Sequence, residues 1–245
     1  LTLSAWINPN NANGIILSKA NENVNDVSWN WEIVEGGKLY FQVTQNGGSG
    51  SRIVKTNSAV ITAGQWQHVA VTFDASNQDA NNLYSVQDVR FFVNGNEITN
   101  RTAGIGIAHV GPVSSIHNGT APVRVGITVN DQGNLAGGFS GQIDDVQIWS
   151  VVRTPEQIQT SRIRELTGSE AGLAAYWKFN EGTGTVAKDQ TANHVDGTLK
   201  NDASWLPLPV ITAPGVTPHI FATDAEETAA DLALIPNASL AFDGV

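Results

Sequence analysis

The chain has 245 residues and contains no cysteine and no methionine. Without cysteine there is no disulfide, so stability must come from a hydrophobic core, which a domain of this size can bury. Cysteine usage leaves the redox compartment open, although its absence suits a bacterial surface protein, and we expect an extracellular or cell-surface location. Because methionine is missing even from position 1, we interpret the chain as a processed or excised piece.

Positive charge is scarce. The chain has 13 Lys and Arg against 23 Asp and Glu, a formal net charge of −10, and only 15% of its residues are charged. Nucleic acids and anionic membranes bind basic surfaces, so the composition argues against both as partners. No apolar run approaches the length of a transmembrane helix, so we expect no membrane insertion. Acidic charge permits divalent cations but also simply confers solubility.

Alternating apolar and polar residues predict β-strands from residue 1 to about residue 152. The first seven residues alternate with period two, and residues 65–74 read as one long strand. Two hairpins are indicated by their turns, one at 35–38 and one at Asn94-Gly95. The first of these turns joins a strand ending at Val34 to one beginning at Leu39.

One helix is predicted at about 155–165, because Thr154 is a good N-cap and Pro155 suits the first helical position. Many short strands with glycine turns and one short helix are typical of an all-β fold, a two-sheet antiparallel jelly-roll β-sandwich. We expect this domain at 1–205, followed by a proline-rich linker at 206–236 and a strand-like segment at 237–245.

Five motifs follow one another along the first 205 residues. They are Leu3-Ser-Ala-Trp-Ile7, Gln65-Trp-Gln-His-Val-Ala-Val-Thr-Phe-Asp74, Phe92-Val-Asn-Gly95, Phe139 to Trp149 with the helix behind it, and Leu173 to Gly182 continuing through Asp189 to Leu199. In order and spacing they resemble the laminin-G-like jelly-roll family of the concanavalin A-like lectin/glucanase superfamily, which is related in fold to the pentraxins.

The resemblance implies an opening strand of the type Ser-Leu-Ala-Phe-Asp-Gly, which the N-terminus lacks. A segment of this type stands at the other end of the chain, as Ser239, Leu240, Ala241, Phe242, Asp243, Gly244 and Val245. A lone strand cannot satisfy its backbone polar groups, so it must return to its own domain, dock on another molecule or begin a further domain. Our first hypothesis is head-to-tail assembly, in which this strand completes the sandwich of the next subunit or repeat and copies of the chain are the partners.

Catalysis is not expected. Retaining laminarinase-like glycosidases on a similar sandwich carry a Glu-x-Asp-x-x-Glu strand, in which one carboxylate is the nucleophile and another the general acid. Here both Glu positions are amides, Gln142 and Gln147, with Asp144 between them. Because an amide can neither attack nor deliver a proton, we assign no catalytic residue and rank a hydrolase third.

Calcium prefers several carboxylate and carbonyl oxygens that converge from loops, and the resemblance implies such sites. Two groups of side chains offer these ligands, with Asp243 as an addition if the tail docks back: Asp189, Asn193 and Asp196, and the pair Asp144 and Asp145. The alternative is turn chemistry, in which Asp and Asn side chains bond their own backbone. Calcium bound here would be structural.

Trp29 and Trp31 share one face of a predicted hairpin strand, with Asn30 and Glu32 opposite. Flat indole rings stack on sugars, so these two residues are the candidates for carbohydrate binding, and core packing is the alternative for both. The competing functional hypothesis is therefore a carbohydrate-binding or cell-adhesion module of a tandem-repeat surface protein, with glycans as partners.

Overall fold

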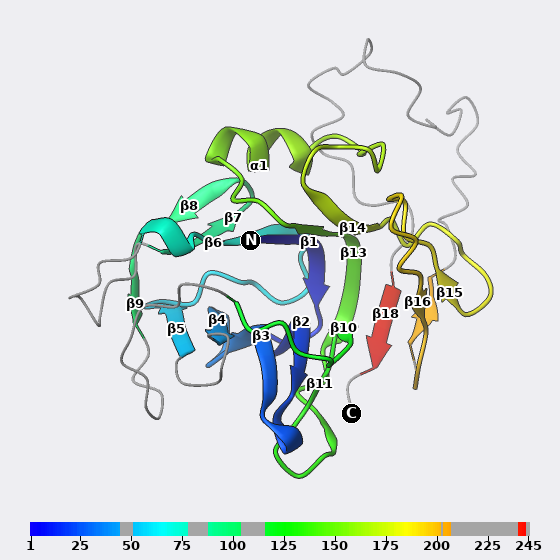
Figure 1. The fold of residues 1–245 in the computed structure, drawn as a ribbon, viewed down its shortest axis with the longest axis horizontal. Coiled ribbons are helices and arrows are strands. Elements are labelled where there is room, and N and C mark those ends of the chain that lie inside the picture. The colour runs from blue at the N-terminus through cyan, green and yellow to red at the C-terminus, as the bar shows by residue number, and fades with distance from the viewer. Residues whose placement is uncertain (45–50, 78–87, 104–115, 202, 207–239, 244–245) are drawn as a thin grey trace.

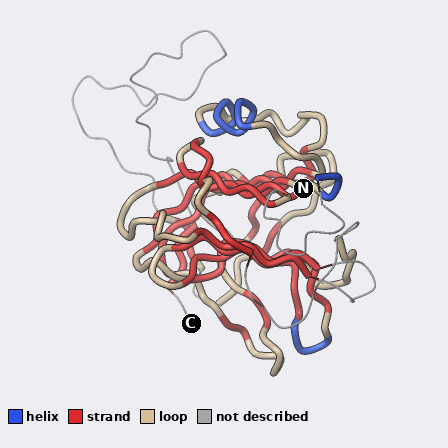
Figure 2. Tube along the Cα trace, turned by 90° about the vertical axis from the view of Figure 1, so that its left-hand side faces the viewer, coloured by secondary structure: helices blue, strands red, loops and turns tan. Residues whose placement is uncertain are grey.

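The computed structural model describes the chain apart from residues 45–50, 78–87, 104–115, 202, 207–239 and 244–245. Two antiparallel sheets pack face to face, and one helix, α1 (Pro155–Arg162), lies over the outer side of one sheet (Figure 1, Figure 2). This architecture confirms the predicted jelly-roll sandwich. None of the helices in the described part of the chain has the length and hydrophobicity to cross a bilayer.

Eight strands of the described residues form the first sheet, with two long strands at its centre. The order is β17 (Ser204–Trp205), β18 (Leu240–Asp243), β13 (Ser140–Trp149), β1 (Thr2–Pro9), β6 (Gln67–Phe73), β7 (Val89–Val93) and β8 (Asn96–Ile98), and β14 (Leu173–Trp177) pairs with β13 outside this path.

Six strands of the described residues form the second sheet, which is built mainly from consecutive hairpins. The order is β10 (Val123–Val125), β2 (Gly14–Asn21), β3 (Asp26–Val34), β4 (Lys38–Thr44), β5 (Ser51–Thr56) and β9 (Arg101–Ala103). The smaller elements are the pairs β11 (Thr128–Val129) with β12 (Leu135–Ala136) and β15 (Val186–Ala187) with β16 (Gly197–Thr198), and the 3-10 turns η1 (Glu22–Val24) and η2 (Ala75–Asn77).

The core lies between the two sheets, and both contribute large side chains to it. Trp31 and Phe41 come from the second sheet, and Phe73 and Phe91 from the first, each at most 2% exposed. Period-two alternation places these residues on the inner faces. Burying each such side chain contributes roughly 1.5–3 kcal/mol, so the sandwich needs no disulfide.

The Asn94-Gly95 hairpin is confirmed as the connection between β7 and β8. Both residues have positive φ angles, 50° and 78°, as a tight turn between twisted strands requires. A side chain at Gly95 would also overlap Gln159, because α1 crosses the hairpin at this point. The turn therefore fixes the register of β7 and β8 and leaves room for α1 to pack against the hairpin.

The helix begins where predicted and ends three residues earlier. The Thr154 side chain accepts from the N–H of Gln157, whose side chain in turn accepts from the N–H of Thr154, a capping box. Ile158 is buried against the outer side of β6 and β7. At Ile163 the N–H bonds to the carbonyl of Thr160, which tightens the last turn and ends the helix there.

The C-terminal segment returns to its own domain. Strand β18 pairs with residues 140–143 of β13 on one side and with β17 on the other. Figure 1 shows it beside β13, near the C-terminus. Ser239, Gly244 and Val245 of the predicted strand lie outside the described residues, as does the predicted linker from 207 onward.

Candidate functional site

The two tryptophans predicted to bind sugar are part of the core. Trp29 is 4% exposed and Trp31 is fully buried, so neither ring presents a face to a ligand. The interpretation of these residues as a binding platform is wrong, and the alternative of core packing is correct. The reason is the alternation of β3, whose apolar side faces the first sheet and whose polar side faces outward.

The outward side of the second sheet carries polar residues in adjacent rows. Glu32 of β3 pairs with Tyr40 of β4, and Tyr40 pairs with Lys55 of β5. Gln42 stands two residues from Tyr40 on the same side, and its Oε1 accepts from the Tyr40 hydroxyl at 3.3 Å. All four side chains are half-buried. We call Glu32, Tyr40, Gln42 and Lys55 the polar face.

A neighbouring hairpin covers the adjacent part of the same sheet. The Thr128 hydroxyl, at the start of β11, donates to Asn30 at 3.5 Å, and the Ser18 hydroxyl donates to the carbonyl of Ile127 at 2.8 Å. Asn30 also donates to the carboxyl of Glu22 at 3.3 Å. Asn30 and Ser18 are therefore buried, whereas the polar face beside them keeps contact with solvent.

Burial and like charge shift the acids beside this hairpin. Burial, with the charge of Glu22 as a second cause, raises the pKa of Glu32 to about 7. Burial and the charge of Asp131 raise the pKa of Glu22 in the same direction. Burial and the nearby carboxylates also raise the pKa of Tyr40, so its hydroxyl keeps its proton. Near neutral pH, Glu32 is therefore divided between a carboxylate that accepts and a carboxylic acid that also donates.

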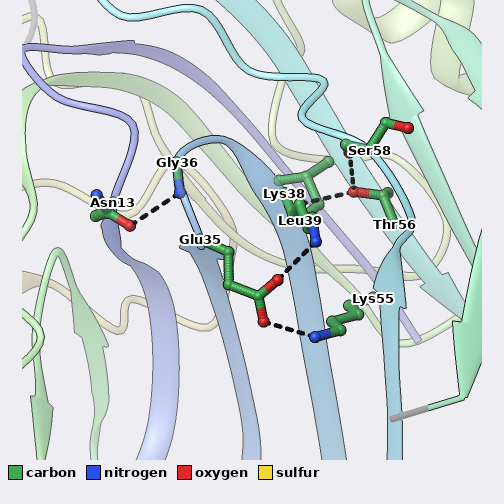
Figure 3. A network of polar contacts seen from close by, with 8 residues as sticks. All are labelled: Asn13, Glu35, Gly36, Lys38, Leu39, Lys55, Thr56 and Ser58. Carbon is green, nitrogen blue, oxygen red and sulfur yellow. Dashed lines mark hydrogen bonds and ion pairs between the residues drawn. The ribbon is translucent and has the colours of Figure 1, made fainter.

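The cations at the edge of the polar face are held by one acid. Both Lys38 and Lys55 place their ammonium groups 2.6 Å from the carboxylate of Glu35, one on each oxygen (Figure 3). The same turn is secured by the N–H of Gly36, which donates to Asn13 at 3.4 Å. Lys55 is paired with Glu35. The groups that the polar face offers to a ligand are therefore the phenol of Tyr40, the amide of Gln42 and the carboxyl group of Glu32, which is partly protonated near neutral pH.

This combination of groups suits a polyhydroxylated ligand. Tyr40 contributes a half-buried aromatic ring with a polar tip. Glu32 across the strand pair and Gln42 two residues along β4 supply hydrogen-bond donors and acceptors beside it. The sequence pattern contained the signal, since Glu32 is opposite the two tryptophans in the alternation and Tyr40 alternates with the apolar Leu39 and Phe41. The two indole rings lie on the opposite, buried side of the same strand.

The strand with the two amides carries a β-bulge. The pairing of β13 with β1 slips between Ser4 and Trp6, and Asp145 adopts a φ of 49°. An extra residue reverses the alternation, so Gln147 returns to the side that Gln142 and Asp144 occupy. That side is the outer one, since the neighbouring Ile143 and Val146 lie in the core.

Both amides take part in internal hydrogen bonds. Gln142 accepts from the side chain of Asn8 at 3.1 Å. Gln147 accepts from the Ser4 hydroxyl and from the indole of Trp149, each at 3.2 Å. These contacts give the two side chains a role within the sheet.

Asp144 and Asp145 stand next to the bulge in a desolvated setting. The Tyr176 hydroxyl donates to Asp145 at 2.6 Å, and the N–H of Asp145 donates to Asp144 at 3.0 Å. Burial, strengthened by the charge of Asp145, raises the pKa of Asp144, and burial also raises that of Asp145. Both carboxyl groups are thus tied into hydrogen bonds within the sheet, and calcium binding at this pair stays a prediction.

The loop predicted to bind calcium is tied by its own hydrogen bonds. Asp189, 6% exposed, accepts from the N–H groups of Tyr176, Thr191 and Val195, each at 3.0 Å, and from the Thr191 hydroxyl at 2.7 Å. The Asn193 amide donates to a backbone carbonyl at 2.9 Å. These contacts are the turn chemistry that was the alternative to calcium.

The third residue of that loop, Asp196, pairs with Lys188 at 2.6 Å and accepts from the N–H of Asp189 at 3.0 Å. Among the described residues, no group of three or more His, Asp or Glu side chains is arranged to hold a metal ion. The observed donors satisfy the loop without an ion, and calcium binding stays a prediction.

The comparisons with known proteins agree with the fold. The laminin G type 3 family model, described as the concanavalin A-like lectin/glucanases superfamily, matches residues 1–159. No curated protein matches the chain. The family resemblance stated from the sequence motifs is confirmed by the matching family model.

Solved structures are also similar to the chain, at low sequence identity. A candidate carbohydrate-binding protein from Bacteroides ovatus is 24% identical over 80% of this chain and 50% of its own, with a TM-score of 0.51, so the chain spans half its length. The SAP-like pentraxin of Limulus polyphemus is 21% identical over 65% and 68%, with a TM-score of 0.43. The CBM40 of the IT-sialidase of Ruminococcus gnavus is 20% identical over 65% and 80%, with a TM-score of 0.47.

Proposed function

Since the chain belongs to the concanavalin A-like lectin/glucanases superfamily, we propose that it is a carbohydrate-binding module of an extracellular or cell-surface protein. The observation that carries the proposal is the polar face, where Glu32, Tyr40 and Gln42 lie side by side across two strands. The description of the similar Bacteroides ovatus protein as a candidate carbohydrate binder is in line with it.

We propose further that the module binds without catalysis. A glycosidase of the retaining type needs two carboxyl groups on either side of the scissile bond. On the outer side of β13, the positions where such enzymes carry Glu are Gln142 and Gln147, and both amides are engaged in hydrogen bonds within the sheet. Turnover of a β-glucan by the purified chain would overturn this part of the proposal.

A glycan array probed with the whole chain tests the binding. We expect binding to one or more oligosaccharides, and we expect Tyr40→Ala to remove it by deleting the ring. Tyr40→Phe keeps the ring and loses only the hydroxyl, so it should retain part of the affinity. Gln132→Ala, at an exposed position in the β11–β12 turn, is the matched control and should bind like the native chain.

Two results would contradict the proposal. One is an array without any signal for a folded chain. The other is a signal that Tyr40→Ala and Glu32→Gln leave unchanged, which would place binding on a different surface. Thermal unfolding of each variant confirms that a loss of binding does not reflect loss of the fold.

A second candidate function is assembly of copies of the chain, head to tail, through the C-terminal strand. The observation that favours it is the position of β18, which is an inserted strand between β13 and β17 rather than an addition at a free edge. Main-chain pairing of this kind supplies affinity in strand-addition complexes. Deleting residues 237–245 should abolish polymers seen by electron microscopy, and polymers that survive the deletion would exclude this route.

A further inference from the structure

Strand β13 has one edge that two different strands share. Its C-terminal half, Val146–Trp149, pairs with β14, and its N-terminal half, Ser140–Ile143, pairs with β18. Without β18, the backbone groups of residues 140–143 on that edge would lose their partners, and an unpaired edge invites another strand. The stretch 140–143 is therefore one wall of a slot for a strand.

The opposite wall of the slot is β17, which has an anchor of its own. The indole N–H of Trp205 donates to the carbonyl of Gly184 at 2.9 Å. The ring also lies against Phe179, with 6.3 Å between centroids, and Phe179 is 2% exposed. These contacts do not involve β18, so both walls of the slot are held by the rest of the domain.

The connection between β17 and β18 is much longer than the pairing needs. Trp205 and Leu240 are direct partners across the two strands. Two antiparallel neighbours of this kind are usually joined by roughly 2–5 residues, whereas residues 206–239 stand between them here. The length of this connection alone means that a hairpin turn of about 2–5 residues does not set the register. The register is given by the pairing of β18 with β13 and β17.

We infer that β18 is an exchangeable strand, and that the slot between β13 and β17 accepts the same segment from a second copy of the chain. The inference rests on the proposed self-assembly and says how it is regulated. The chain's own strand and the strand of a second copy pair with the same backbone groups, so each excludes the other. A chain whose own strand is docked is closed, and only a chain with an open slot accepts a neighbour.

The balance between the two forms follows from concentration. The contacts in the slot are the same in either case, since the donated segment has the same sequence and register. The effective concentration of a tethered strand at its own slot is on the order of 1 mM for a short flexible linker and is lower for a longer one. The closed monomer should therefore dominate in dilute solution, and exchange should increase as the protein is concentrated or refolded at high concentration.

Two single-cysteine chains test the exchange directly, because the native chain has no cysteine to interfere. Gln142 and Ala241 are partners across β13 and β18, and partners in an antiparallel pair lie about 4.5–5.5 Å apart between Cα atoms, within disulfide range. A chain with Gln142→Cys, mixed with a tagged chain with Ala241→Cys and oxidised gently, should give a mixed disulfide whose yield rises with protein concentration.

The matched control replaces the first chain with Asn8→Cys. Asn8 is the partner of Gln142 on β1, so it lies one strand farther from Ala241 and out of disulfide range. The inference predicts a mixed dimer several-fold more abundant than in the control at every concentration tested. Equal yields in the two mixtures would overturn it.

A chain carrying both Gln142→Cys and Ala241→Cys separates this inference from the assembly proposal. Oxidised at low concentration it should lock its own strand, stay monomeric in sedimentation and assemble only after reduction. If the locked and reduced chains assemble equally, copies associate through another surface and the inference fails while self-assembly stands. If the reduced and native chains stay monomeric even near the millimolar range, the assembly proposal itself fails.

Discussion

Replacing Asp189 with alanine removes four hydrogen bonds from one carboxylate. The side chain accepts from three backbone N–H groups, those of Tyr176, Thr191 and Val195, and from the Thr191 hydroxyl. Tyr176 belongs to β14, so the carboxylate joins the loop after β15 to the first sheet. The loss therefore affects both the turn and its attachment.

The cost can be estimated from those donors. Leaving one buried donor unsatisfied costs about 1–3 kcal/mol, and water that enters the space left by the side chain recovers part of it. We expect a net loss of about 3–5 kcal/mol in the free energy of unfolding, the range found when buried polar networks are broken. For a domain of this size each kcal/mol shifts Tm by about 2–4 °C, so Tm should fall by about 10 °C.

The effect should also depend on pH. Burial opposes ionisation of Asp189, but the donors outweigh it and hold its pKa below the ordinary value. A lowered pKa means that the stabilisation is present above the unfolded-state value of about 3.9 and is lost as the pH falls through the folded-state value. The native chain and Asp189→Ala should therefore converge in stability in acid.

Calorimetry of the native chain, Asp189→Ala and the control Asp131→Ala, each with and without EDTA, checks the reasoning. Asp131 is an exposed acid next to Glu22, and its loss should change Tm little. A fall of less than about 2 °C for Asp189→Ala would refute the hydrogen-bond account. A native Tm that EDTA lowers as far as the substitution does would show that calcium holds the loop.

Three further outcomes are expected. Trp31→Ala should destabilise the chain by about 3–5 kcal/mol in urea unfolding, because the ring is fully buried in the core. Asp88→Ala should lower the free energy of unfolding by about 3–5 kcal/mol in the same assay, because the buried guanidinium of Arg52 loses the carboxylate that lies 2.8 Å from it. Burial and Glu22 raise the pKa of Glu32 to about 7, so native stability should decline as the pH rises from about 4.3 to about 7, and Glu32→Gln should flatten that decline.

Local pattern carried much of the fold. The alternation of 29–34 and 39–44, with a glycine turn between them, predicts the β3–β4 hairpin, and the Asn94-Gly95 turn predicts the next one. Thr154 and Pro155 predict the start of α1. Each of these features depends on residues close together in the chain, where propensity and turn chemistry act directly.

The candidate site was harder to predict from the sequence pattern than the fold. A period of two defines two sides of a strand, but the position of the partner sheet decides which side is buried. In β3 the buried side is the one that carries Trp29 and Trp31. The bulge at Asp145 likewise depends on the pairing of β13 with β1, strands far apart in the sequence. Neither outcome follows from spacing within a single strand.

The sequence by itself determined that this is a β-sandwich of laminin-G-like type with a strand-like segment at its C-terminus. Only the tertiary structure decided where that segment lies, between β13 and β17 of its own sheet, and which polar residues face outward together. The physical reason is range. Strand formation is encoded by neighbouring residues, whereas the choice of partner edge depends on which backbone groups the assembled fold leaves unpaired.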